Sequence, residues 1–144
     1  MAVTEPSDPQ FESRVREGFH KQRLMATLGA ELRRVSPGEV VISLPIREGL
    51  TQQTGYLHAG AIAAVLDSAC GFAAFTLMPA GSDVVSIEFK QNLLAPAVGD
   101  RLEARAKVIR AGRTISVVHA DGVTFADGRE KLVATMTGTM MCVR

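Results

Sequence analysis

Hydrophobic residues in the first part of the chain recur with a helical spacing. Phe11, Val15 and Phe19 lie four residues apart, which predicts a short amphipathic helix that ends before Gly29. Asp8-Pro9 precedes these residues and is predicted to supply the helix N-cap and a first-turn proline. Residues 1–7 carry no such pattern and are expected to form a disordered lead-in.

The pattern changes to residue-by-residue alternation at Ala30. Two predicted strands with a Pro37-Gly38 turn between them occupy residues 31–46. One face of the second strand is expected to consist of Val40, Ile42, Leu44 and Ile46. Four further alternating runs cover residues 83–94, 100–110, 114–126 and 130–143. Strands joined by short turns favour an antiparallel sheet.

Between the second and third predicted strands lies the stretch TGYLHAGAIAAVLDSACGFAAFTLM, residues 54–78. It predicts a long buried helix that starts near Ala59 and carries one charged residue, Asp67. The order helix, two strands, long helix and four strands predicts an α+β fold, with the long helix lying across a curved antiparallel sheet. Residues 1–144 are expected to form one domain, because a chain of this length can bury a core by itself.

Asp67 lies in a stripe of small residues on the predicted long helix. At about 100° per residue, the bulky Ile62, Val65 and Phe72 fall on the opposite side and predict the face that packs on the sheet. This leaves room on the side of Asp67 for another helix or a ligand to approach closely. The small residues on that side are Gly60, Ala63, Ala64, Cys70, Gly71 and Ala74.

Two interpretations of Asp67 are open. In the structural one, Asp67 caps or pairs with a buried neighbour while the small residues pack a dimer interface. In the functional one, the carboxylate lies in a groove of low polarity and acts as a general base or nucleophile. The sequence favours the functional interpretation, because no Lys or Arg lies within the helix to neutralise the charge.

The entrance of the long helix is a candidate electrophilic element. The first N–H groups of a helix have no partner within it and lie at the positive end of its dipole. Those of Ala59 and Gly60 can therefore hold a developing oxyanion in acyl transfer. His58 is expected to order the loop by hydrogen bonding rather than to titrate in catalysis.

Composition argues against several other functions. The chain is 47% hydrophobic and 22% charged, with a formal net charge of +1, so neither a nucleic-acid nor a membrane partner is expected. Residues 59–80 are a candidate membrane span, but the central Asp67 argues against it.

Metal, disulfide and secretion signals are also weak. His20, His58 and His119 do not have metal-ligand spacing, so neither a metal nor another cofactor is expected. Cys70 and Cys142 lie far apart in hydrophobic settings and are expected to be free thiols. Together with the lack of a secretory pattern, this predicts a cytoplasmic protein.

The helix entrance and the order of elements resemble a known family. GYLHAGAIAAVLDSA, residues 55–69, is similar to the hotdog-fold acyl-CoA thioesterases, and within them to the PaaI-like branch. That family's pattern is N-x-x-G-x-x-H-G-G followed by an Asp on the helix, and the resemblance covers nearly all of the chain after residue 29. At the corresponding spacings this chain has Gln52, Gly55, His58, Ala59, Gly60 and Asp67.

The resemblance implies a role for each matching residue. Asp67 would be the general base or nucleophile, and the N–H of Ala59 or Gly60 would polarise the thioester carbonyl. Gln52 would position the water or the carbonyl, and Ser86 would help to hold the attacking water. Two departures change the site: Gln52 in place of Asn lengthens that side chain by one methylene, and Ala59 in place of the middle glycine tightens the turn but keeps its N–H.

The function implied by the resemblance is hydrolysis of an acyl-CoA to a free acid and CoA. The active sites would lie between the subunits of a homodimer, with two dimers forming a homotetramer. Gly55 and His58 would shape the substrate-binding loop. Lys90, Asn92 and Arg113 are either contacts for the CoA nucleotide or ordinary solvated residues.

Two alternatives have the same fold. A non-catalytic module would bind acyl-CoA without cleaving it. A hydratase is less favoured, because no adjacent Asp and His are evident in the sequence. The expected acyl group is aryl-acetyl or of short to medium length, since a pocket in a chain of this size should be only moderately deep. The expected wall residues are Phe11, Phe19, Leu24, Leu57 and Phe75.

Overall fold

The computed structural model describes residues 4–144, and its strands and long helix follow the predicted order. The helices are α1 (Phe11–Lys21), α2 (Arg23–Leu28) and α3 (Ala59–Phe75), with a 3₁₀ turn, η1, at Glu48–Leu50. The strands are β1 (Glu31–Ser36), β2 (Glu39–Pro45), β3 (Asp83–Leu93), β4 (Arg101–Ala111), β5 (Ile115–Ala126) and β6 (Arg129–Val143). The predicted disordered lead-in lies partly outside the described residues, at 1–3, and residues 4–7 form no helix or strand.

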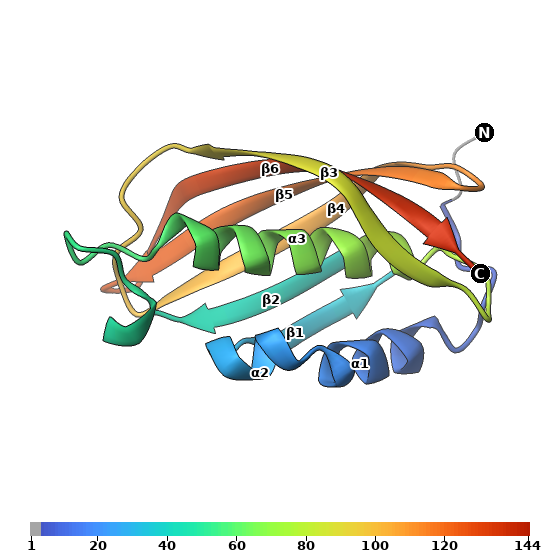
Figure 1. Cartoon of the computed structure of the whole chain (residues 1–144), viewed down its shortest axis with the longest axis horizontal. Coiled ribbons are helices and arrows are strands. Elements are labelled where there is room, and N and C mark those ends of the chain that lie inside the picture. Colours follow the sequence, from blue (N-terminus) through green and yellow to red (C-terminus); the bar gives the residue numbers. More distant parts are fainter. Residues whose placement is uncertain (1–3) are drawn as a thin grey trace.

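The strands form a six-stranded antiparallel sheet in the order β1-β2-β4-β5-β6-β3. Figure 1 shows α3 lying along the curved sheet, with α1 and α2 beside β1 and with β3 on the other side of α3. The β5–β6 turn has φ angles of 52° at Asp127 and 73° at Gly128, as a two-residue hairpin turn requires. This architecture confirms the predicted α+β fold with a long helix across a curved sheet.

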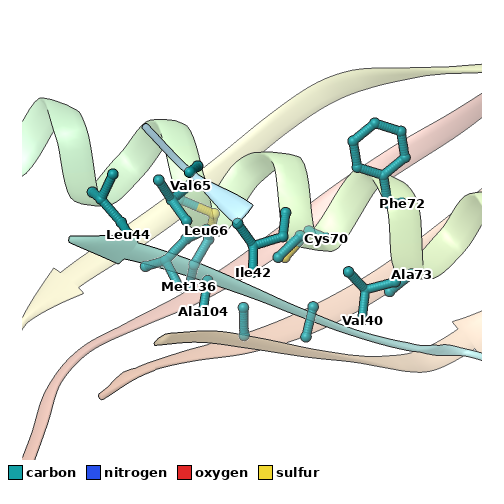
Figure 2. Packing of buried hydrophobic residues seen from close by; sticks show 14 of the residues in the cluster. Val40, Ile42, Leu44, Val65, Leu66, Cys70, Phe72, Ala73, Ala104 and Met136 are labelled. Carbon is teal, nitrogen blue, oxygen red and sulfur yellow. The ribbon is translucent and has the colours of Figure 1, made fainter. Parts of the chain in front are cut away.

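The core lies between α3 and the sheet (Figure 2). Val40, Ile42 and Leu44 of β2 are each 0% exposed, as the alternation predicts, and Val65 and Leu66 of α3 are equally buried. Fully burying a side chain of this size contributes about 1.5–3 kcal/mol. The position of α3 over the sheet is therefore fixed by its apolar residues, and this orients its opposite side toward solvent.

The N-terminal helix differs from the prediction at its start and in its middle. The structure has two helices, because the chain turns at Gln22, whose φ and ψ are −81° and 93°. Asp8 is not the N-cap: its carboxylate accepts a hydrogen bond from the backbone N–H of Gln10, in a turn that precedes the helix. The predicted end before Gly29 is confirmed, with Gly29 in the left-handed region at φ 78°.

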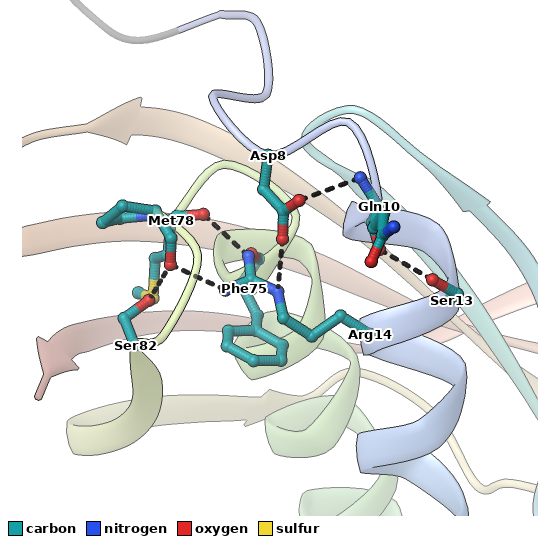
Figure 3. A network of polar contacts seen from close by, with 8 residues as sticks. Asp8, Gln10, Ser13, Arg14, Phe75, Met78 and Ser82 are labelled. Atoms are coloured by element: carbon teal, nitrogen blue, oxygen red, sulfur yellow. Dashed lines mark hydrogen bonds and ion pairs between the residues drawn. The ribbon is translucent and has the colours of Figure 1, made fainter.

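Arg14 joins α1 to the end of α3 (Figure 3). Its guanidinium donates hydrogen bonds to the carbonyl oxygens of Phe75, Met78 and Pro79 at 3.1, 2.7 and 2.7 Å. Its Nε lies 3.2 Å from Oδ2 of Asp8, and its guanidinium carbon lies 4.3 Å from the centroid of the Phe75 ring. The last carbonyl groups of a helix lack partners within it and carry partial negative charge, so a cation at this place stabilises the end of α3.

Candidate active site

The open side of α3 carries Asp67 among small residues, but two predicted members of this stripe lie elsewhere. Cys70 and Ala74 are both 0% exposed. Cys70 faces β6, where a Cβ built on Gly138 would lie 3.7 Å from the Cβ of Cys70. Ala74 lies in the last turn of α3, where neighbouring segments cover the helix. Its position on the same side of the helix as Asp67 therefore does not expose it to solvent. The small residues that remain partly or fully exposed are Gly60, Ala63, Ala64 and Gly71.

The bulky face of α3 is shared between two partners. Ile62 and Val65 are buried in the core beneath the helix, as predicted. Phe72 was expected to face the sheet with them, but its ring lies 6.0 Å from the ring of Phe19 in α1. The N-terminal helix therefore covers part of the face that the sequence assigned to the sheet.

Asp67 contacts the edge strand β3 at Ser86. Ser86 Oγ donates a hydrogen bond of 2.7 Å to Asp67 Oδ1, and it also lies 3.3 Å from Sδ of Met140. The carboxylate is thus held by a neutral hydroxyl, and within residues 4–144 no cation pairs with it. Its negative charge is available to a proton or to a carbonyl carbon.

Cys70 lies one turn from Asp67 but is not a second nucleophile. Burial raises the pKa of the Cys70 thiol to about 12, and the negative charge of Asp67 contributes to the rise. A thiol with this pKa is protonated at neutral pH, and the protonated form is a poor nucleophile. Cys70 and Cys142 are both free, as the sequence predicts.

A cavity of about 560 Å³ opens beside Asp67. This volume is within the range of small-molecule sites. It lies between α1 and the open side of α3, and the start of β3 and the C-terminus also border it. Its wall includes the polar side chains of Asp67, Ser68 and Ser86, together with Gln22, Phe72 and Phe75.

Most of the predicted wall residues lie outside this cavity. Phe75 is part of its wall. Phe19 borders a second cavity and Leu24 borders a third. Leu57 is 3% exposed within the core, and Phe11 packs against the core from outside. Phe11, Phe19, Leu24 and Leu57 therefore do not line the cavity beside Asp67.

The entrance of α3 is capped by His58. His58 Nδ1 accepts a hydrogen bond of 2.8 Å from the N–H of Gly60, so the ring proton of the neutral imidazole is on Nε2. This agrees with the expected loop-ordering role. The N–H of Ala59 has no hydrogen-bond partner within the described residues. Of the two predicted oxyanion donors, Ala59 is the one whose N–H is open.

Gln52 and Gly55 form a turn before the helix. Gln52 Oε1 accepts hydrogen bonds from the N–H and, at 2.6 Å, from the hydroxyl of Thr54. Gly55 has a φ of 88°, and its N–H donates to the carbonyl oxygen of Gln52 at 2.9 Å. The side chain of Gln52 is therefore engaged within its own loop and does not contact Asp67.

The polar residues of β3 divide between its two faces. Gln91 Nε2 donates to the carbonyl oxygen of Ala59 at 3.3 Å, so Gln91 faces the entrance of α3. Lys90 and Asn92 alternate with it and project from the other face. Arg113 lies in the β4–β5 turn and is exposed. The structure does not bring these three candidate nucleotide contacts together within one chain.

A β-bulge explains why sequence reasoning missed Gln91. The register of β3 against β6 shifts between Ser86 and Glu88. Without this shift, strict alternation places Ser86 on the same face as Lys90 and Asn92; with it, Ser86 shares its face with Gln91. No sequence signal marks the bulge.

The candidate base, Asp67, and the candidate oxyanion donor, the Ala59 N–H, are far apart along α3. Ala59 and Asp67 are eight residues apart, and at 1.5 Å per residue this is about 12 Å along the helix axis. Reacting groups must lie about 3–3.5 Å from the atoms they act on. One thioester carbonyl therefore cannot contact Asp67 and the Ala59 N–H of the same chain.

Comparison with known proteins places the chain in a family. Residues 54–130 match the model of the thioesterase superfamily. A crystal structure of a thioesterase family protein from Silicibacter pomeroyi is 47% identical, with a TM-score of 0.91, and the match covers 92% of this chain and 98% of that one. A 1,4-dihydroxy-2-naphthoyl-CoA hydrolase from Listeria monocytogenes is 28% identical, over 76% of this chain and 87% of its own.

A more distant structure shows the same fold. The E. coli PaaI protein from the phenylacetic acid degradation operon is 19% identical, with a TM-score of 0.84, and the match covers 94% of each chain. The chain belongs to the thioesterase superfamily, with the hotdog fold, and is a thioester hydrolase. This confirms the resemblance that the sequence indicates.

Two kinds of feature are absent from residues 4–144. No helix in this part of the chain is long and apolar enough to cross a membrane. The same residues contain no group of three or more His, Cys, Asp or Glu side chains arranged to hold a metal ion.

Proposed function

We propose that this protein hydrolyses an acyl-CoA thioester, with Asp67 as the general base or nucleophile. The observation that carries the proposal is the Asp67–Ser86 hydrogen bond at the wall of a cavity large enough for an acyl group. In the general-base form, Asp67 takes a proton from a water molecule as the water oxygen attacks the thioester carbonyl carbon. The resulting oxyanion collapses, the C–S bond breaks, and the CoA thiolate leaves as the product acid forms. In the nucleophile form, a carboxylate oxygen attacks the thioester carbonyl carbon, the C–S bond breaks and the CoA thiolate leaves. Water then hydrolyses the resulting mixed anhydride to the free acid and regenerates the Asp67 carboxylate.

The oxyanion donor in this proposal is the Ala59 N–H of a second copy of the chain. The distance of about 12 Å between Ala59 and Asp67 within one chain supports this arrangement. Two copies of α3 that run antiparallel bring Asp67 of one copy next to Ala59 of the other. Gln91 would fix the Ala59 peptide group through its hydrogen bond to the Ala59 carbonyl oxygen. Gln52 would donate a hydrogen bond from its amide nitrogen to the bound thioester or to the water.

The edge of the sheet supports a homodimer. In the described chain β3 pairs with β6 on one side, and its other edge is open. An open edge with apolar side chains tends to pair with another chain. Four large apolar residues of β3 are about half exposed: Val85 at 47%, Ile87 at 52%, Phe89 at 44% and Leu93 at 54%. A tetramer made of two such dimers remains our expectation, and light scattering would measure both states.

The CoA nucleotide would be bound outside the acyl cavity. Lys90, Asn92 and Arg113 are our candidates, since a dimer can bring residues of two chains together on one ligand. Gly55 and His58 would hold the loop on which the thioester rests. We expect no metal or redox cofactor to take part, and a cytoplasmic location.

The test of the proposal is Asp67→Asn, assayed by thiol release over a panel of acyl-CoA substrates. We expect kcat to fall by about 10³-fold or more, because the amide can neither accept a proton nor attack. Asp83→Asn is the matched control. Asp83 borders the same cavity, but its carboxylate accepts a hydrogen bond from the N–H of the neighbouring Val84. If the unmodified protein binds acyl-CoA by calorimetry but releases no thiol from any member of the panel, it is a binding module instead. Hydration of crotonyl-CoA without hydrolysis would point to a hydratase.

A further inference from the structure

Gln22 lies between two cavities on either side of the N-terminal segment. The first is the cavity of about 560 Å³ that contains Asp67. The second, of about 360 Å³, lies between the N-terminal helices and β1. Gln22 borders both cavities, at the break between α1 and α2.

The side chain of Gln22 is fixed toward α3. Ser68 Oγ donates a hydrogen bond of 2.6 Å to Gln22 Oε1. Ser68 is 8% exposed and directly follows Asp67 in the chain. A buried hydroxyl without a partner is costly, so each of these two polar groups holds the other in place. The bond therefore holds the Gln22 side chain against α3, at the wall of the first cavity and next to the residue that follows Asp67.

The second cavity has the chemistry of a site for a methylene chain. Four apolar residues contribute to its wall, and the polar residues Arg16, His20 and Glu31 border it near solvent. Buried apolar area, rather than polar contacts, would hold an alkyl chain there. The apolar residues are Phe19, Ala26, Ala30 and Leu32.

We propose that Gln22 is a specificity-determining residue that limits the length of the acyl group. This rests on the proposed function, since the thioester must lie near Asp67. A short or medium acyl group fits the first cavity, and a longer chain would have to pass Gln22 to reach the second. Gln22 held by Ser68 closes that passage.

The experiment is a chain-length profile of kcat/KM for saturated acyl-CoA substrates from C4 to C16, with Gln22→Ala and the unmodified protein. We expect the ratio of long-chain to short-chain kcat/KM to rise in Gln22→Ala, by about fourfold for each additional methylene that enters the second cavity. Arg23→Ala is the matched control, because Arg23 is the next residue and is exposed outside both cavities.

A second variant separates passage through Gln22 from general loosening of the helices. Ala26→Leu fills part of the second cavity, so adding it to Gln22→Ala should return the profile to that of the unmodified protein. An unchanged ratio in Gln22→Ala, or a shifted ratio that Ala26→Leu does not reverse, would overturn the role of Gln22. Either result would still be compatible with acyl-CoA hydrolysis. Absence of thiol release at every chain length, in contrast, would refute the proposed function itself.

Discussion

Replacing Arg14 by Met should destabilise the fold by about 3 kcal/mol. Met keeps most of the apolar stem but removes the three hydrogen bonds to the carbonyl oxygens of Phe75, Met78 and Pro79. A hydrogen bond from a charged donor contributes about 1.5–3 kcal/mol when it is buried, and the cation–π contact with Phe75 adds about 0.5–1 kcal/mol. In a dry site these contacts would sum to about 5–10 kcal/mol. The Arg14 side chain is 18% exposed and water can hydrogen-bond the same carbonyl oxygens in the variant, so each bond is counted at about 0.5–1 kcal/mol, which with the ring contact gives about 3 kcal/mol.

Urea unfolding followed by circular dichroism measures this loss, at a fixed protein concentration because an oligomer's stability depends on it. In a thermal scan the same loss corresponds to a Tm lowered by about 10 °C. Arg16→Ala is the control on the same helix. Arg16 forms an exposed ion pair with Glu12, which should contribute less than about 0.5 kcal/mol. If Arg14→Met is no less stable than Arg16→Ala, the guanidinium does not anchor the end of α3.

Three other variants test separate parts of the account. Ser86→Ala should lower kcat about 10- to 100-fold, because a hydrogen bond to a carboxylate contributes about 1.5–3 kcal/mol; Ser82→Ala, in the same cavity, is the control, and equal losses in both would exclude a specific role for Ser86. Burial raises the pKa of the Cys70 thiol from its ordinary value of 9.0 to about 12, so between these pH values the thiol ionises in the unfolded chain but not in the folded one. The free energy of unfolding should therefore fall by about 1.4 kcal/mol per pH unit as pH rises through this window, and less steeply in Cys70→Ala. Parallel pH profiles would contradict this. Arg113→Ala should raise KM for acyl-CoA several-fold but spare N-acetylcysteamine thioesters, and equal losses on both substrates would argue against phosphate contact.

The elements of the sheet and the site carboxylate could be predicted because their signals are local. Val40, Ile42 and Leu44 alternate with polar residues, and this period is sufficient to assign a half-buried strand. Asp67 is conspicuous because it is the one charge in an apolar helix. The separation of Asp67 from Ala59 also follows from residue counting, once the helix is assigned.

The features that could not be predicted depend on contacts between distant segments. Residues 19–28 contain neither Gly nor Pro, so nothing local marks the break at Gln22, which is held by Ser68 of another helix. The bulge in β3 likewise has no local signal, and it decides that Gln91 rather than Lys90 faces the helix entrance. The break at Gln22 and the bulge in β3 affect the site more than the fold, because they determine which side chains face the proposed substrate.

The central claim is that each active site combines Asp67 of one copy with the Ala59 N–H of another. Ala59→Pro removes that N–H at the first position of α3, where proline is tolerated. His58 already has the extended φ and ψ, −63° and 137°, that a residue before proline adopts.

Co-refolding Ala59→Pro with Asp67→Asn in equal amounts, followed by the thiol-release assay, measures the claim most directly. Each variant alone should be nearly inactive. Random pairing makes half of the dimers mixed, and in each mixed dimer one of the two sites has both an intact Asp67 and an intact Ala59 N–H. The mixture should therefore recover about a quarter of the unmodified activity. No recovery from two folded, freely exchanging variants would mean that the two groups act within one chain, and would contradict the shared site.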